Sequence, residues 1–156
     1  MTQALPTHTS LSYATLTEDL LMGKNNEKKL LEYLNNLPEN KDSQFEVFKN
    51  KFETFDFIND NGVIAELKSR RVSHDRYKDT MIGNNKMKVC KEKHKDHVKG
   101  AEYRFYFLFT DGLYTWKYGD SDYEVRKFFH KDKQSYKDYA YIPISALKLV
   151  STEITS

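Results

Sequence analysis

The sequence predicts an α/β domain built on a mixed sheet, with elements in the order helix, three strands, helix, strand, and extra strands towards the C-terminus. Three observations lead to this prediction. Leucines recur at helical spacing within residues 25–37. Two alternating apolar runs flank the turn at residues 59–62, whose Asn61-Gly62 pair is a strong hairpin signal. The run at residues 103–110, YRFYFLFT, is the most β-like segment and follows a lysine-rich helical segment.

The N-terminal part of the chain is expected to form an arm and one helix. Residues 1–16 are rich in Thr and Ser and are predicted to be a loose arm. A helical pattern begins at Thr17, and Gly23 is expected to divide a short first turn from the main helix at residues 25–37. Pro38 ends this helix because proline cannot continue the hydrogen-bond ladder.

The middle of the chain is predicted to contain the first three strands and the second helix. Residues 44–49 alternate as a strand, and the hairpin follows. A polar, basic loop then leads to Asp79 or Thr80, either of which can cap a helix from about Met81 towards Val98. The side chains expected to face the core from this helix are Ile82, Met87 and Cys90.

The C-terminal third reads as a series of strands separated by turns. After the strand at residues 103–110, Asp111-Gly112 is a second hairpin turn. The predicted elements that follow are strands at residues 113–118, 123–129 and 139–144, and a short final helix at residues 145–150.

Length and composition indicate a single globular domain, assigned to residues 17–150 of the 156. No run of eighteen apolar residues is present, which argues against a membrane partner. The N-terminus lacks the pattern of a secretion signal, and the single Cys90 fits a reducing compartment. We therefore expect a cytoplasmic protein, or one inside a host cell if the source is viral, as the lysine- and asparagine-rich composition hints.

Charge is distributed unevenly along the chain. Residues 1–65 carry 6 basic and 10 acidic side chains, whereas residues 66–100 carry 11 basic and 5 acidic ones. Such a positive block suits a surface that binds phosphate groups. A solvated, lysine-rich helix face explains the same block equally well.

Three charged residues interrupt the apolar hairpin. Asp56 lies on its first strand, and Glu66 and Lys68 lie on its second strand, where residues two apart share a face. Closure at Asn61-Gly62 places Asp56 within reach of Glu66. Paired carboxylates offer the hard oxygen ligands that Mg²⁺ or Mn²⁺ prefers, and a neighbouring lysine can orient a water molecule.

The pattern of Asp56 followed by Glu66-Leu67-Lys68 resembles the signature of the PD-(D/E)XK nuclease superfamily. The predicted order of elements over residues 17–110 resembles the core of that family, although Phe55 stands where the family often has proline. The resemblance implies a restriction-endonuclease-like fold and Mg²⁺-dependent cleavage of DNA, duplex or branched, with Mn²⁺ as a substitute ion.

The resemblance also implies roles for individual residues. Asp56, Glu66 and the Leu67 carbonyl would hold the metal, and Lys68 would position the attacking water. Glu27, on the first helix, matches a glutamate that many members carry near the site. Lys86, on the following helix, matches an additional basic residue that many members point into the site.

The basic loop offers candidate contacts to nucleic acid. Arg70, Arg71 and Arg76 have guanidinium groups that match phosphate oxygens, and Tyr77 can stack on a base or sugar. Packing within the loop is an equally good interpretation for Tyr77. The histidines, including His74, have no zinc-binding spacing and are expected on the surface.

Simpler interpretations stay open. The Asp56, Glu66 and Lys68 group can be a cross-strand salt bridge, Glu27 an ordinary helix residue, and Lys86 a solvated lysine. At the level of function, the alternatives are a nucleic-acid-binding module without catalysis and an oligomeric interaction protein, such as a homodimer, that associates through its aromatic strands.

Overall fold

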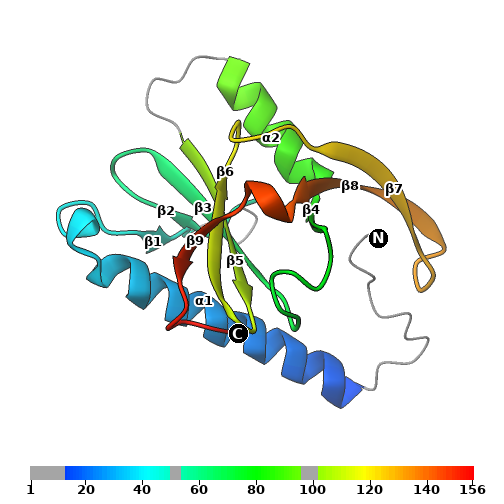
Figure 1. The fold of residues 1–156 in the computed structure, drawn as a ribbon, viewed down its shortest axis with the longest axis horizontal. Helices are drawn as coiled ribbons and strands as arrows, with labels where there is room; N and C mark the ends of the chain where they lie inside the picture. The colour runs from blue at the N-terminus through cyan, green and yellow to red at the C-terminus, as the bar shows by residue number, and fades with distance from the viewer. Residues whose placement is uncertain (1–12, 50–53, 96–101) are drawn as a thin grey trace.

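The computed structural model describes residues 13–49, 54–95 and 102–156 of the chain (Figure 1). Helix α1 spans Tyr13–Asn36 and helix α2 spans Asn84–Lys95. Strands form a six-stranded sheet in the order β1-β2-β3-β5-β6-β9 and a three-stranded sheet in the order β4-β8-β7. The strands are β1 (Glu46–Val47), β2 (Phe57–Ile58), β3 (Val63–Ser69), β4 (Asp79–Gly83), β5 (Glu102–Phe109), β6 (Gly112–Lys117), β7 (Glu124–His130), β8 (Ser135–Pro143) and β9 (Lys148–Ser151). The chain is therefore of the predicted α/β class with a mixed sheet.

Only one neighbouring pair of strands is parallel in the sheets that the structure describes. Strands β3 and β5 run parallel, with Glu66 opposite Phe105, and all other pairs are antiparallel. The connection from β3 to β5 contains β4 and α2. Because a parallel pair needs a long crossover, this connection places α2 and β4 beside the middle of the large sheet.

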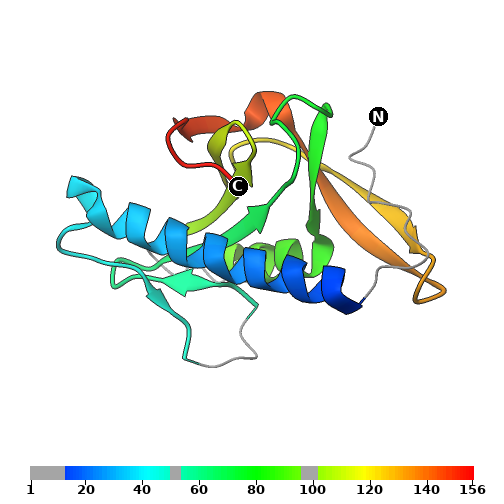
Figure 2. The same cartoon turned by 90° about the horizontal axis from the view of Figure 1, so that it is seen from below.

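Helix α1 covers one face of the large sheet (Figure 2). Its Leu30 and Leu34 are buried against alternate residues of the central strands. The strand residues in this core are Val63, Ala65 and Leu67 of β3 and Tyr106 and Leu108 of β5. Since side chains alternate along a strand, Glu66 and Lys68 point to the other face.

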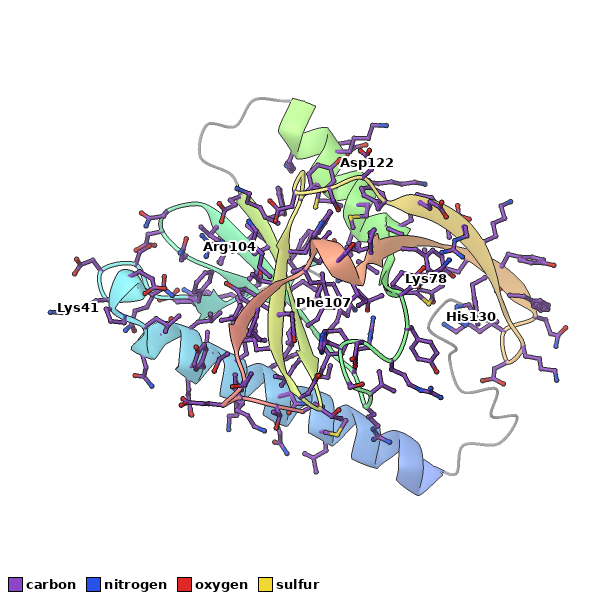
Figure 3. All side chains as sticks on the ribbon, in the orientation of Figure 1. Lys41, Lys78, Arg104, Phe107, Asp122 and His130 are labelled. Carbon is purple, nitrogen blue, oxygen red and sulfur yellow. The ribbon has the colours of Figure 1, made fainter. Side chains whose placement is uncertain are left out.

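The opposite face of the sheet carries an aromatic core that α2 covers. Met87 and Cys90 of α2 are buried there, with Ile82, Ala140 and Ile142 of the small sheet. The aromatic members from β5 and β6 are Tyr103, Phe105, Phe107, Phe109 and Trp116. Phe107 lies near the centre of the molecule (Figure 3). This apolar surface is the environment of the Glu66 side chain.

The first helix is longer and more continuous than the sequence indicates. It begins at Tyr13 rather than Thr17, so residues 13–16 of the predicted arm are helical, and residues 1–12 lie outside the described part. The predicted division at Gly23 is wrong, since α1 runs through it. A Cβ added at Gly23 would meet no atom within 4 Å. A glycine in a helix interior destabilises it by only about 1 kcal/mol, which packing elsewhere along α1 outweighs.

The predicted helix from Met81 is wrong at its start. Residues Asp79–Gly83 form strand β4 instead, and α2 begins at Asn84. Asp79 and Thr80 are thus strand residues rather than caps, and residues 96–98 of the predicted helix lie outside the described part. Pairing with β8 explains the difference, because hydrogen bonds to a distant strand override local helix propensity.

Three smaller corrections concern the strands. The first strand covers Glu46–Val47 rather than all of residues 44–49. Strand β8 begins at Ser135, earlier than the predicted 139–144, because it pairs with the whole of β7. The predicted helix at residues 145–150 is wrong: a 3-10 turn at Ile144–Ala146 leads into β9, which pairs with β6.

Neither helix, within the part of the chain that the structure describes, is long and apolar enough to cross a bilayer.

Candidate active site

The turn between β2 and β3 sets the register of the site. Asn59 Oδ1 accepts hydrogen bonds from the backbone nitrogens of Asn61, at 3.1 Å, and Val63, at 3.0 Å. Gly62 has a φ of 80°, which glycine adopts without strain. The resulting register pairs Phe57 with Ala65 and Ile58 with Ile64. Asp56 directly precedes β2, and its side chain lies close to that of Glu66.

Asp56 continues the hydrogen bonding to β3 beyond the end of β2. Its backbone nitrogen donates to the Ala65 carbonyl at 3.1 Å, and its Oδ2 accepts from the Leu67 nitrogen at 2.8 Å. In a strand the carbonyl of a residue points to the same side as its own N–H. The Leu67 carbonyl therefore faces the side of β3 on which Asp56 lies.

Glu66 is the most deeply buried acidic residue in the described part of the chain, with 3% of its surface exposed. Lys86 of α2 donates through its Nζ to Glu66 Oε2 and also to the Thr54 carbonyl. Lys68 Nζ lies 4.0 Å from Glu66 Oε1. One buried carboxylate is therefore approached by two ammonium groups from different elements.

The electrostatics of this group follow from burial. Burial, followed by the negative charge of Asp56, raises the pKa of Glu66 to about 8. Lys68 and Lys86 oppose that shift without cancelling it. Burial also lowers the pKa of Lys68, and the nearby charges of Lys86 and Arg70 add to the effect. The interior here disfavours isolated charge of either sign.

Glu27 joins the same group from α1. Burial raises the pKa of Glu27, and the negative charge of Asp56 raises it further. Lys24, Lys68 and Lys86 act in the opposite direction. The neighbouring Asn26 donates through Nδ2 to Ser69 Oγ at 3.0 Å, which fixes this turn of α1 against the end of β3. The three carboxylates that the resemblance singles out thus share one electrostatic environment.

A cleft of about 660 Å³ opens beside these residues. Its walls come from α1, β3, the loop after β3, β4, α2 and β8. The lining includes Glu27, Lys68 and Lys86, together with Lys137 and Tyr139 of β8. Glu66 and Asp56 do not line the cleft, so the two lysines that approach Glu66 form the surface at that point.

Sequence reasoning missed Lys137 and Tyr139. They lie some seventy residues after the motif, Lys137 in a polar stretch and Tyr139 at the start of the predicted strand. Their place in the cleft depends on the pairing of β8 with β4, which brings Tyr139 opposite Gly83. Alternation along β8 would have placed the two on one face, but no local signal indicates which face points to the cleft.

The arginines of the basic loop have different surroundings. The Arg70 guanidinium donates to Met81 O at 2.5 Å, to Ser69 O at 3.4 Å and to Thr80 Oγ1 at 3.4 Å. Burial lowers the pKa of Arg70 to about 10. This side chain therefore joins β3 to β4 within the fold. Arg71 and Arg76 are exposed, and the Arg76 guanidinium lies 5.4 Å from the ring centre of Tyr77, which lines the cleft.

A second group of possible metal ligands lies outside this cleft. His74, Asp75 and Asp111 bring one ligand atom each within 4.8 Å, a spacing that no other described group of three such residues reaches. His74 Nδ1 already contacts Asp111 Oδ2 at 2.5 Å, and Asp75 Oδ1 accepts from Ser73 Oγ at 2.9 Å. His74 also stacks on Tyr114, with ring centres 4.6 Å apart. These contacts join the basic loop to the turn between β5 and β6.

The chain was compared with family models, with curated proteins and with solved structures, and nothing matches. The site therefore has to be interpreted from its own chemistry. It is a cleft in a mixed α/β domain, lined by Glu27, Lys68 and Lys86, with the Glu66 and Asp56 carboxylates behind the two lysines.

Proposed function

We propose that this protein is a metal-dependent nuclease that hydrolyses phosphodiester bonds in DNA. The observation that carries the proposal is the buried Glu66 carboxylate beside Asp56, with Lys68 and Lys86 directed at it from two elements. Carboxylates are expensive to bury unless a cation compensates them. The order of α1, β1 to β3, α2 and β5 supports the resemblance to PD-(D/E)XK nucleases, with β4 as an insertion.

The types of donor suit a hard divalent cation, but Glu27, Asp56 and Glu66 do not bring three ligand atoms within 4.8 Å of one another in this structure. Asp56 and Glu66 offer carboxylate oxygens, the Leu67 carbonyl faces the side on which Asp56 lies, and Glu27 is near enough for the charge of Asp56 to raise its pKa. The Lys86 ammonium stands where positive charge compensates Glu66, and so indicates that a cation is favoured there. Mg²⁺ or Mn²⁺ bound here would lower the pKa of a water molecule and neutralise charge on a phosphate oxygen.

The chain's own residues supply the remaining chemistry. Lys68 shares the Glu66 face and lines the cleft, so its ammonium can orient a water molecule and offset charge that develops on the phosphate. Arg71 and Arg76 are exposed on the loop that follows and can bind the DNA backbone. Lys86 holds the Glu66 carboxylate in place from α2.

A nucleic-acid-binding module without catalysis is the second candidate. One observation favours it: Lys86 already pairs with Glu66, and neither carboxylate of the motif lines the cleft. In that case the two lysines would present positive charge to phosphates, and the carboxylates would only hold those lysines in place.

Incubation with labelled linear, flapped and four-way DNA tests the proposal, with Mg²⁺, Mn²⁺ or EDTA in parallel. We expect products with either ion and none with EDTA. Binding of DNA without products under all three conditions would support the second candidate. Absence of both binding and cleavage would contradict both functions.

A further inference from the structure

Strands β7 and β8 extend beyond the rest of the small sheet. Pairing of β4 with β8 covers Tyr139 to Pro143, whereas pairing of β7 with β8 continues to His130 and Ser135. The end of this hairpin is therefore a two-stranded ribbon, which projects from the body of the protein (Figures 1 and 2). His130 lies on this projecting part (Figure 3).

Two aromatic side chains are exposed on one face of the ribbon. Phe129 and Tyr136 are cross-strand partners with ring centres 5.0 Å apart. Their exposed fractions are 39% and 69%. Packing within this chain leaves much of both rings in water. An exposed aromatic pair of this kind marks a surface that another molecule can cover.

The surroundings of this pair are cationic. Five basic side chains lie within residues 126–138, against two acidic ones. The Arg126 guanidinium donates a hydrogen bond to Asp79 and lies over the ring of Tyr141. The exposed basic side chains are Lys127, on the face of Phe129, Lys131 and Lys133, in the turn, and Lys137, on the opposite face. Lysine is depleted at protein–protein interfaces, whereas exposed aromatic rings among lysines suit a polyanion with flat rings.

The ribbon is continuous with the candidate active site. Lys137 and Tyr139 line the cleft, and Lys137 Nζ lies 5.3 Å from the ring centre of Tyr139. The Tyr139 hydroxyl bonds His130 Nε2 at 2.7 Å, and Phe128 packs edge-on against the Tyr139 ring. These contacts thus join the ribbon to the cleft wall through the face opposite to that of Phe129 and Tyr136.

We infer that the ribbon binds single-stranded nucleic acid, with Phe129 and Tyr136 stacking on unpaired bases and the lysines contacting phosphates. Unpaired bases expose their ring faces, whereas a duplex hides them and offers only backbone and groove edges. This inference rests on the proposed function in one respect: it gives the proposed nuclease a substrate with a single-stranded segment, such as a flap.

Binding in EDTA tests the ribbon independently of cleavage. Fluorescence anisotropy would compare labelled oligothymidylate of roughly 30 nucleotides with a duplex of equal length, a size that exceeds one binding site. Replacing both rings, by Phe129→Ser with Tyr136→Ser, should weaken oligothymidylate binding about tenfold or more, because stacking on two rings is lost. Duplex affinity should change less than about twofold, since the lysines that contact its phosphates remain.

A matched control replaces two exposed apolar residues on other strands, Val47→Ser with Leu149→Ser, whose exposed fractions are 60% and 55%. This variant should bind as wild type. Tyr136→Trp should retain single-strand binding and show fluorescence quenching on addition of oligothymidylate, over the constant background of the buried Trp116.

Two results would overturn the inference. One is a double ribbon variant that does not discriminate between the two ligands, because it loses duplex and single-strand binding equally or loses neither. The other is a wild-type dimer in native mass spectrometry that the same variant converts to monomer, which would identify the ribbon as a protein interface. If the ribbon variants change binding as expected but the wild-type protein cleaves no DNA, the inferred binding surface stands and only the proposed nuclease activity is contradicted.

Discussion

Glu66 carries a carboxylate into an apolar interior, and its neighbours show how the fold tolerates it. Lys86 bonds one oxygen, Lys68 approaches the other at 4.0 Å, and Asp56 adds a second negative charge. Buried charges persist only when they are paired or bind a metal, so removing one charge from this group leaves another without compensation. Changes at single residues of this group should therefore have measurable effects.

Glu66→Gln should change how stability depends on pH. The pKa of Glu66 is raised from 4.5 to about 8, so between these values the folded state holds more protons than the unfolded state. The corresponding stability is complete below pH 4.5 and is lost as pH rises through 8. The free energy of unfolding of wild type should fall over this range, by at most about 1.4 kcal/mol per pH unit from this group.

Glutamine does not titrate, so the variant should show a flatter profile. Urea unfolding at several pH values in EDTA would measure this. Glu102→Gln is the matched control, because Glu102 also pairs with basic side chains but lies on β5 with 29% of its side chain exposed. Identical slopes for wild type and Glu66→Gln would show that Glu66 titrates as an ordinary exposed glutamate.

Lys68→Met should separate catalysis from binding. Methionine keeps much of the apolar stem but removes the ammonium, which we expect to act mainly on charge that develops in the transition state. Cleavage should fall by a factor on the order of 10² to 10³. DNA affinity in Ca²⁺, a larger ion with looser geometry that should allow binding without efficient cleavage, should change little. Equal losses of binding and cleavage would make Lys68 a simple phosphate contact.

At the scale of elements, the loop between β3 and β4 combines two roles. Arg70 bonds backbone and side-chain oxygens at the ends of both strands, whereas Arg71 and Arg76 are exposed. The sequence alone predicts the same role, phosphate binding, for all three arginines. Their different surroundings distinguish Arg70, which joins two strands, from the two exposed arginines, which we propose as DNA contacts.

Arg70→Ala should therefore lower stability, by about 2 kcal/mol, because buried acceptors lose a charged donor. Arg76→Ala should leave stability unchanged and reduce the slope of log K against log salt by about one unit, the effect of one lost phosphate contact. Denaturant unfolding and salt-dependent anisotropy measure the two effects. Stability loss at Arg76, or a reduced slope with normal stability at Arg70, would reverse these assignments.

The elements also show which parts of the fold local sequence determines. The β2–β3 hairpin and strands β5, β6 and β7 were predicted correctly, because Asn-Gly and Asp-Gly turns and alternating side chains act over a few residues. Strands β4 and β9 were missed because each is stabilised by pairing with a distant strand. Residues 79–83 have helix formers after them and no strand signal of their own.

At the scale of the whole molecule, the same distinction applies to the candidate site. The juxtaposition of Asp56 and Glu66 could be predicted because it depends on one hairpin register. The contact of Lys86 with Glu66 depends on how α2 packs against the sheet, and the resemblance suggested it where spacing alone could not. The contribution of Lys137 and Tyr139 to the cleft could not be predicted, since it requires the small sheet.

In the whole molecule, the cleft, the basic loop and the face of the ribbon that carries Lys137 and Tyr139 adjoin one another. Lys68 and Lys86 lie at the base of the cleft, Tyr77 of the loop lines it, and Lys137 and Tyr139 connect it to the ribbon. A nuclease needs such adjoining surfaces, because substrate must contact binding surfaces and reacting groups at the same time.

The rate of Mg²⁺-dependent cleavage of flapped DNA by Glu66→Gln, relative to Glu102→Gln, tests the central claim most directly. The two variants carry the same substitution in the same sheet, and only Glu66 belongs to the candidate site. We expect a rate at least about 10²-fold lower for Glu66→Gln, with Glu102→Gln at the wild-type rate. Equal rates for two folded variants would contradict a metal site at Glu66.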